Sequence, residues 1–362
     1  MTDVLNAELR DPEEAWSESA YRKKYALIKA AYEQIFAGNT NVSPTTSEQI
    51  QELEKLRVQV RDERNEYRRL LREQARRESY EDQIVRAITS HVEPDIVFGR
   101  PSPICGSDND IIVHLTDLHA GINISNWFNK YNDDVLGERL DAFLQKIREV
   151  KRTHNSENMY LILGGDMLSG NIHPTLRIEN NQDLIEQFLT VVDYLSAWIA
   201  KVSEDFSEVH VYITPGNHSR MTQKKDDSLS HENMDNLIIP YLSAKLQNYS
   251  NIHFHVNNIE HSIAMFIVRN NNVFASHGDK DTIENIVQHM TMMFGVKPDI
   301  CYLGHRHFNS YTTTYNTKVI QSGCLSGSDS YCMDHRLCNK PEQTVTVVND
   351  GGVECIYDVK FD

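Results

Sequence analysis

The spacing of apolar residues divides the chain into two parts that follow different periods. Over residues 12–37 the apolar side chains recur every three or four positions, as Tyr21, Tyr25 and Ile28 do. This spacing predicts an amphipathic helix. A second helix is predicted from about residue 45 to residue 89, a stretch without glycine or proline. The first 90 residues therefore form a helical arm.

The second predicted helix carries a partial heptad repeat. Leu53, Val60 and Tyr67 recur every seven residues, as expected for a two-stranded coiled coil. We therefore expect a homodimer through residues 45–89. An antiparallel hairpin with residues 12–37 is the alternative. Acidic residues lie beside each basic cluster of residues 61–77, which favours a solvated, salt-bridged face over a stripe that binds nucleic acid.

Beyond a proline-containing linker at residues 91–107, short apolar runs replace the helical period. Strands are predicted at 111–115, 160–163 and 209–213, and helices at 133–152 and 181–203. This alternation is typical of a parallel α/β core. Further strands are predicted at 262–268, 273–276, 300–303, 317–321, 344–349 and 353–359, with a helix at 281–294. Residues 108–362 are thus predicted to form one domain of mixed sheets covered by helices.

The acidic charge of the chain lies mainly in this second part. The net charge is −16, and residues 1–90 hold 15 basic and 17 acidic residues, so most of the excess lies beyond residue 90. Such a balance argues against charge-driven binding of nucleic acid over the whole surface. It does not exclude a nuclease, because bound divalent metals invert the local field.

Targeting signals and cysteine motifs are absent from the sequence. No apolar run approaches the ~18 residues of a membrane span, and residues 1–16 have no secretory pattern. We therefore expect a cytoplasmic protein that does not bind membranes. The six cysteines form no C-x-x-C pair, so free thiols are expected; Cys324, Cys332 and Cys338 are the closest group.

Five short segments rich in metal-ligand side chains follow predicted strands in a fixed order. They are Asp117-Leu118-His119, Gly164-Gly165-Asp166, Gly216-Asn217-His218, His277-Gly278-Asp279 and Gly304-His305-Arg306-His307. Sites in α/β sheets form at the carboxyl ends of strands, so these side chains are expected to meet. Carboxylates mixed with imidazoles suit Mn²⁺, Fe²⁺ or Zn²⁺ rather than Ca²⁺. Two metals ~3.5–4 Å apart are a common device for splitting phosphate esters. No cysteine joins these segments, which argues against a structural zinc site.

The order of these segments resembles the calcineurin-like metallophosphoesterase superfamily over roughly residues 108–310. The resemblance implies an α/β fold, a four-layer αββα sandwich, here preceded by the helical arm. It implies two divalent metal ions, with Mn²⁺ favoured and Fe²⁺, Zn²⁺ or Mg²⁺ also suited. By this resemblance, the first metal is held by Asp117, His119 and His307, the second by Asn217, His277 and His305, and Asp166 bridges both.

The resemblance also implies a reaction. A hydroxide that bridges the metals would attack phosphorus in line, and His218 would assist the leaving group. Within this superfamily, G-N-H is usually followed by Asp or Glu, whereas Ser219 and Arg220 follow here. His218 therefore needs another carboxylate, such as Asp226 or Asp227, or acts without one.

The residues that follow Asp166 favour nucleic acid as the substrate. Asp166-Met167-Leu168-Ser169, followed by Pro174, is most similar to phage-type and prokaryotic DNA-repair exonucleases. Those proteins often carry His or Asp where Ser169 stands, and His173 is a candidate replacement. Arg220 is a candidate contact for substrate phosphate.

We therefore expect a DNA nuclease with exonuclease-like action. Two alternatives stay open. One is a phosphatase or cyclic-nucleotide phosphodiesterase that acts on small substrates. The other is an oligomeric scaffold whose phosphoesterase domain binds a ligand without hydrolysing it.

Overall fold

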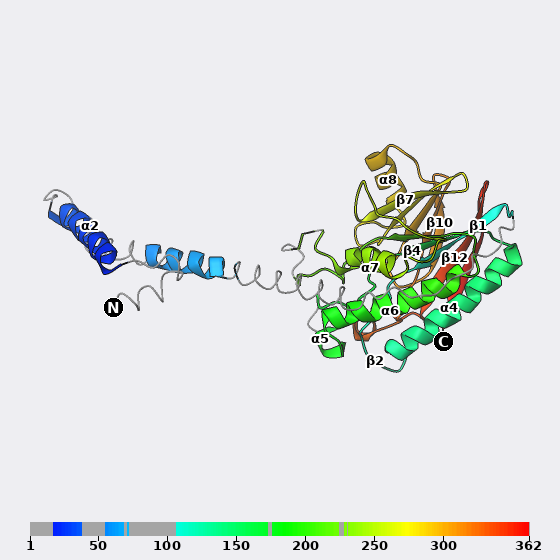
Figure 1. The fold of residues 1–362 in the computed structure, drawn as a ribbon, viewed down its shortest axis with the longest axis horizontal. Helices are drawn as coiled ribbons and strands as arrows, with labels where there is room; N and C mark the ends of the chain where they lie inside the picture. Colours follow the sequence, from blue (N-terminus) through cyan, green and yellow to red (C-terminus); the bar gives the residue numbers. More distant parts are fainter. Residues whose placement is uncertain are drawn as a thin grey trace. The chain divides into compact units, whose positions relative to one another are not determined.

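The strands of the second part of the chain form two main sheets (Figure 1). The structure is a computed structural model that describes residues 17–37, 55–68, 71, 106–172, 176–223, 228–229 and 231–361. The chain divides into two units, residues 1–82 and 83–362. In the first unit, α2 (Glu18–Ala37) and residues 55–68 are helical. Most of the predicted coiled coil and all but the end of the predicted linker lie outside the described residues.

The first sheet has six strands in the order β13-β12-β1-β4-β5-β6. Their bounds are β1 Asn109–Leu115, β4 Met159–Leu163, β5 Val209–Ile213, β6 Ile252–Phe254, β12 Glu342–Asn349 and β13 Gly352–Lys360. Strands β1, β4, β5 and β6 are mutually parallel, whereas β12 runs antiparallel to both β1 and β13. The sheet therefore contains the parallel core that the sequence predicts, with an antiparallel pair added at one edge.

The second sheet has five strands in the order β10-β11-β9-β8-β7. Their bounds are β7 Ile263–Val268, β8 Asn271–Ser276, β9 Ile300–Leu303, β10 Ser310–Thr314 and β11 Thr317–Gln321. Strand β9 is parallel to both β8 and β11, and the outer strands pair antiparallel. A small hairpin of β2 (Ile124–Ser125) and β3 (Lys130–Tyr131) lies outside both sheets.

Helices cover the outer faces of the two sheets (Figure 1). Against the first sheet pack α4 (Asp133–His154), α6 (Leu184–Ser203) and α7 (Ile238–Lys245), and against the second packs α8 (Ile286–Phe294). The remaining short helices are α5 (Leu176–Glu179), η3 (Met234–Leu237) and α9 (Ser330–Asp334). The result is the four-layer αββα sandwich, which confirms the predicted fold class.

Side-chain alternation along the strands explains how one sheet serves two cores. On β1, Ile111, Val113 and Leu115 join the core beneath the helices. Ile112 joins a separate core between the sheets, where Ala275 and Tyr302 come from the second sheet. Because successive side chains of a strand point to opposite faces, a fully apolar strand such as β1 is expected to be buried on both sides.

An ion pair joins the two sheets at the end away from the strand carboxyl termini. Arg269 lies in the turn between β7 and β8, and its guanidinium donates to both carboxylate oxygens of Asp110 on β1, at 2.8 Å each.

Among the described helices, we find none whose length and apolar content would let it cross a lipid bilayer.

Candidate metal centre

Strand ends from both sheets bring the five ligand segments to one place. Asp117 follows β1, Asp166 follows β4 and Asn217 follows β5, all from the first sheet. His277 follows β8 and His305 follows β9, both from the second sheet. Main-chain hydrogen bonds tie these segments together, including Asp117 N to Gly165 O at 3.0 Å and Gly304 N to His277 O at 2.8 Å. The site therefore lies where the carboxyl edges of the two sheets meet.

Backbone conformation at this edge is unusual. Positive φ angles occur at Asp117 (55°), His119 (47°), Asp166 (51°), His305 (68°) and His307 (59°). Residues other than glycine rarely adopt this left-handed region, and such residues cluster at functional sites.

Three of the predicted ligand atoms lie close together where the first metal is expected. Asp117 Oδ1 lies 3.1 Å from His307 Nε2 and 3.8 Å from His119 Nε2. The two imidazole nitrogens are 3.4 Å apart. Metal–nitrogen bonds of about 2.0–2.1 Å in a tetrahedral site place neighbouring ligand atoms roughly 3.4 Å apart. This triangle therefore has the size that a transition metal requires.

The second metal position is built around Asp166. Its Oδ2 lies 3.1 Å from His277 Nε2, and the ligand atoms of Asp166, His277 and His305 all lie within 4.8 Å of one another. Asp166 also groups with His119 and His218 within the same limit. Asp166 thus belongs to both candidate groups, as the prediction of a shared ligand requires.

Four buried polar atoms at the site support this assignment. Within the described residues, Asn217 Oδ1 has no hydrogen-bond partner, and Asp117 Oδ1, Asp166 Oδ2 and His277 Nε2 have only the histidine–carboxylate contacts given above. Native proteins leave few buried polar atoms unsatisfied. All four are oxygen or nitrogen donors of the kind that bind divalent transition metals. The residues present therefore fit a pair of such ions.

Glycine is required where the loops approach most closely. A Cβ atom on Gly216 would lie 2.1 Å from Asp166 Oδ1 and 2.2 Å from Asp166 N. Gly165 has φ +91°, and a Cβ there would meet Thr214 O at 2.6 Å. A larger residue at Gly216 would push the Asp166 carboxylate out of place, and one at Gly165 would collide with the backbone of Thr214 and Gly216.

Asp235, which the sequence reasoning missed, holds two of these loops. Its carboxylate accepts hydrogen bonds from Asp166 N at 3.1 Å, Gly216 N at 3.0 Å and Ser219 Oγ at 2.7 Å. Burial raises the pKa of Asp235 to about 6, although the donors Gly216 and Ser219 favour the ionised form. No local motif marks this residue, because its partners lie far away in the sequence.

Burial and opposite charge compete for the ionisation of the ligands. Burial acts to raise the pKa of Asp166 and Asp117, but neighbouring histidines outweigh it and hold both pKa values below the ordinary range. Burial acts to lower the pKa of His277, yet the Asp166 carboxylate raises it to about 10. A cation bound between these groups would replace the proton on His277 and would neutralise the carboxylates.

His218 lies beside the first metal position, with its ring centroid 4.7 Å from that of His119. Its backbone N–H donates to Asp166 Oδ1 at 2.7 Å, and its Nδ1 lies 3.0 Å from the carbonyl oxygen of Ser169. Burial lowers the pKa of His218 to about 4, against the pull of Asp166. The orienting partner is thus a main-chain carbonyl, while Asp226 and Asp227 lie outside the described residues.

The two residues predicted to contact the substrate are Arg220 and His173. Arg220 follows the catalytic turn, and its guanidinium donates to the carbonyl oxygens of Thr222, Gln223 and Asn217 at 3.0, 2.9 and 3.4 Å. His173 lies outside the described residues. A pocket of about 450 Å³ opens beside His277, and Lys280 and His231 help to line it.

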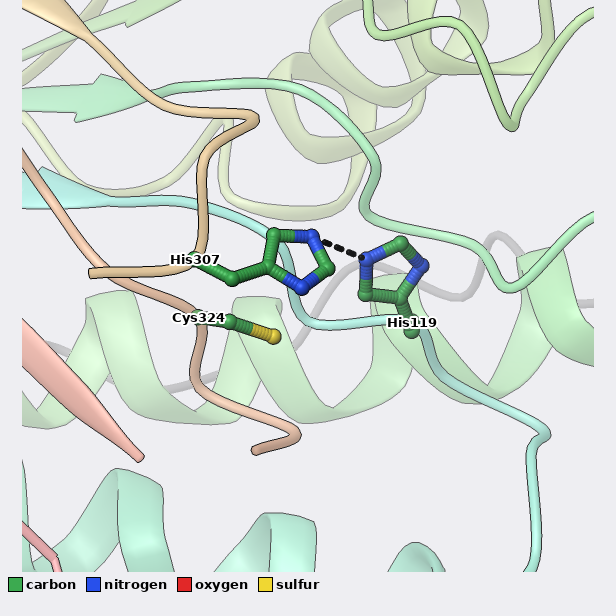
Figure 2. Close-up of side chains that lie close together, drawn as sticks. All are labelled: His119, His307 and Cys324. Carbon is green, nitrogen blue, oxygen red and sulfur yellow. Dashed lines mark hydrogen bonds between the residues drawn. The ribbon is translucent and has the colours of Figure 1, made fainter. Parts of the chain in front are cut away.

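Cys324 is a second residue that the sequence reasoning missed. It lies in the loop after β11 and is 1% exposed. Figure 2 shows its sulfur directed toward His307, with His119 close by. The sulfur and the ring nitrogens of the two histidines lie within 4.8 Å of one another. The feature of the sequence that draws attention to Cys324 is its place in the group that it forms with Cys332 and Cys338.

Comparisons with known proteins agree with this geometry. The model of a family described as calcineurin-like phosphoesterase matches residues 111–337. The SPbeta prophage-derived uncharacterized protein YonJ of Bacillus subtilis (strain 168) is 22% identical over 337 residues, which are 88% of this chain and 81% of that protein.

Solved structures also match, at low similarity. A hypothetical protein, PH1004, from Pyrococcus horikoshii OT3 is 13% identical, and the match covers 70% of this chain and 88% of that chain with a TM-score of 0.37. A novel archaeal phosphodiesterase is 12% identical over 69% of this chain and 99% of that chain, with a TM-score of 0.34.

The family model includes all five ligand segments and more than half of the chain. These segments meet at one sheet edge. There, Asp117, Asp166, Asn217 and His277 place buried oxygen and nitrogen atoms of the kind that bind divalent metals. The chain therefore belongs to the calcineurin-like phosphoesterase family of metal-dependent phosphoester hydrolases.

Proposed function

We propose that this protein is a two-metal phosphodiesterase that acts on DNA as a nuclease. The observation that carries the two-metal mechanism is the position of Asp166, which groups with His119 on one side and with His277 and His305 on the other. A carboxylate shared in this way supports two ions close enough to act on one phosphate group. The nuclease-like run from Asp166 to Ser169 supports DNA as the substrate.

Each group of residues has a distinct part in this mechanism. When bound, the metals supply Lewis-acid activation and charge neutralisation at the phosphate. Asp117, His119 and His307 would hold one ion, Asn217, His277 and His305 would hold the other, and Asp166 would be shared. His218, oriented by the Ser169 carbonyl, faces the scissile phosphate and stabilises or protonates the leaving oxygen.

An exposed aromatic turn beside the site supports a nucleic-acid substrate. The β2–β3 hairpin follows His119 closely, and its turn carries Trp127 and Phe128, which are 91% and 63% exposed. Asn126 and Asn129 fasten this turn to the carbonyl oxygen of Ser328, in the loop that begins with Cys324. Exposed aromatic rings are platforms on which the bases of single strands stack.

The pocket beside His277 favours a second candidate, the hydrolysis of a small phosphoester. Its volume of about 450 Å³ is in the range of small-molecule sites. Lys280 lines it together with the acidic Glu260, Asp279 and Asp281, so the volume of the pocket, and not its charge, favours this candidate. A cyclic nucleotide would fit inside a pocket of this volume, whereas a DNA strand would occupy only its edge.

The test is cleavage of end-labelled single- and double-stranded DNA with Mn²⁺ or with EDTA. We expect Mn²⁺-dependent cutting that the Asp166→Asn variant loses, because the shared ligand is weakened. Asp350→Asn, the same change in an exposed turn far from the ligand segments, serves as the matched control and should cut normally. Product lengths separate exonuclease from endonuclease action.

A Trp127→Ala variant tests the aromatic turn. Loss of base stacking, about 1–3 kcal/mol per base, should raise KM for single-stranded DNA by roughly 5- to 150-fold. Turnover of a small synthetic diester should stay unchanged.

The wild-type protein separates the candidates. If DNA stays intact but cyclic nucleotides are hydrolysed, the second candidate holds. Metal binding without hydrolysis of any ester would favour the ligand-binding scaffold.

A further inference from the structure

Cys324 is held rigidly against a metal-ligand residue. Its Sγ donates to the carbonyl oxygen of Asp117 at 3.1 Å and lies 2.9 Å from Ser326 Oγ. The same carbonyl accepts from the backbone N–H groups of Leu325 and Ser326, at 3.2 and 3.3 Å. The loop that carries the sulfur is therefore anchored to the residue that supplies a carboxylate to the first metal position.

The surroundings of this sulfur contain several metal-ligand atoms. Ring nitrogens of His119 and His307 lie within 4.8 Å of it, and Figure 2 shows the three side chains gathered at one point. A second observation is independent of the cysteine. Asp117 is fully buried, and its Oδ1 has no hydrogen-bond partner within the described residues although it lies 3.1 Å from His307 Nε2.

We propose that Cys324 supplies a sulfur ligand to the metal position formed by Asp117, His119 and His307. This inference rests on the metal centre of the proposed function and goes beyond its seven oxygen and nitrogen ligands. Metal binding would replace the thiol proton, so a metal–sulfur bond forms while one proton passes to solvent.

A sulfur ligand changes which ion this position prefers. Thiolate is a soft ligand that selects zinc, iron or cobalt, whereas manganese and magnesium prefer oxygen. The first position would therefore hold a thiophilic ion such as Zn²⁺ or Fe²⁺. The Asp166–His277–His305 position contains no sulfur and would accept Mn²⁺. The two positions would thus load with different metals.

Cobalt substitution tests this proposal without measuring activity. The purified full-length protein is stripped with chelator, loaded with Co²⁺, and examined for a sulfur-to-cobalt charge-transfer band in the near ultraviolet. We expect the band in wild-type protein and its loss in Cys324→Ser. Cys301→Ser is the matched control, because Cys301 is also buried but packs in the apolar core that α8 covers; this variant should keep the band.

Competition between Zn²⁺ and Mn²⁺, with bound metal measured by elemental analysis, gives a second readout. We expect Cys324→Ser to reduce the preference for Zn²⁺ by about 10- to 100-fold, the range seen when residues that support a metal site are changed. Circular dichroism verifies that the variant is folded.

The outcomes separate this inference from the proposed function. Wild-type protein that binds cobalt without the band, or a band that persists in Cys324→Ser, would overturn the sulfur ligand even if DNA is cut. A band that depends on Cys324 in protein that leaves DNA intact would support the ligand and reject the nuclease. Failure to bind cobalt at all would reject both.

Discussion

At the scale of the residue, the metal centre depends on backbone positions that cost free energy. Asp117, His119, Asp166, His305 and His307 all have positive φ, a conformation that costs of order 1–3 kcal/mol for residues other than glycine. The motifs predict which residues come together, because their chemistry and order are visible in the sequence. They do not predict this conformation or the contacts of Asp235 and Cys324, which arise from tertiary structure alone.

Asp235→Ala should destabilise the folded protein. The change leaves the N–H groups of Asp166 and Gly216 and the hydroxyl of Ser219 without their acceptor. Each unsatisfied buried donor costs about 1–3 kcal/mol, so with three donors we expect the free energy of unfolding to fall by at least about 3 kcal/mol. Urea unfolding measures this loss. Asp235→Asn retains an acceptor oxygen and should lose less; equal stability of the Ala variant and wild type would contradict the prediction.

A histidine cluster on the first sheet should make stability depend on pH. His210 Nδ1 lies 3.1 Å from His255 Nε2, and the ring of His253 stacks on His210 with centroids 5.0 Å apart. Burial lowers the pKa of His210 and His255, and the neighbouring histidines reinforce it. Glu208, 3.3 Å from His210 Nε2, acts in the opposite direction.

The sign of the effect follows from these lowered pKa values. On acidification the unfolded chain takes up protons first, so stability present above the ordinary pKa of about 6.5 is lost as the pH falls below it. We expect the urea midpoint to fall between about pH 7.5 and about pH 5.5, and His210→Phe to reduce that fall. The same pH dependence in wild type and variant would refute this role.

At the scale of the element, most helices and strands follow from sequence pattern, and their boundaries follow from side-chain contacts. The strand predicted at 209–213 has the bounds of β5. The helix predicted from residue 181 begins at Leu184 instead, because Asp183 caps it and forms a capping box with Glu186. Strand β10 was not predicted, since Ser310–Thr314 is polar and its place depends on pairing with β11.

The helix predicted at 281–294 begins at Ile286, and no side chain caps it at Asn285. Asp281 accepts hydrogen bonds from Ser276 Oγ at 2.9 Å and contacts His289 Nδ1 at 2.8 Å, so it joins a loop to the helix. The strand predicted at 273–276 begins earlier than expected, because β8 already starts at Asn271. Arg269 lies in the turn before it, with φ 49°.

Arg269→Ala should weaken the link between the two sheets. The forked pair with Asp110 is lost, and the buried carboxylate keeps only its contacts with Asn158. Because hydrogen bonds to charged groups contribute about 1.5–3 kcal/mol, we expect the free energy of unfolding to fall by roughly 2 kcal/mol. Arg269→Lys keeps the charge but loses the fork, so its stability in urea should be intermediate. Wild-type stability in both variants would show that the pair contributes nothing.

At the scale of the whole molecule, the helical arm is expected to set the oligomeric state. Large apolar side chains are exposed along its described helices, including Ile28 at 63%, Val60 at 61% and Tyr67 at 63%. Exposed apolar stripes of this kind favour pairing with a second copy. We propose the homodimer through residues 45–89 on this basis.

Removal of residues 1–90 should then convert a dimer to a monomer. Light scattering on the full-length and shortened proteins measures the mass directly, and Val60→Glu in the full-length chain should have the same effect, because it places a charge in the predicted seam. A full-length protein that is already monomeric at all concentrations would exclude the dimer. DNA cleavage by the shortened protein would show that the arm is dispensable for chemistry.

The meeting of two sheet edges at the metal centre has a consequence for biosynthesis. The ligands span Asp117 to His307, and Gln343, on the later strand β12, holds Thr116 through hydrogen bonds to its N–H and carbonyl group. β12 also pairs along nearly the whole of β1. A growing polypeptide therefore lacks a finished centre until β12 has left the ribosome. Hydrolytic activity should appear only after β12 has paired with β1.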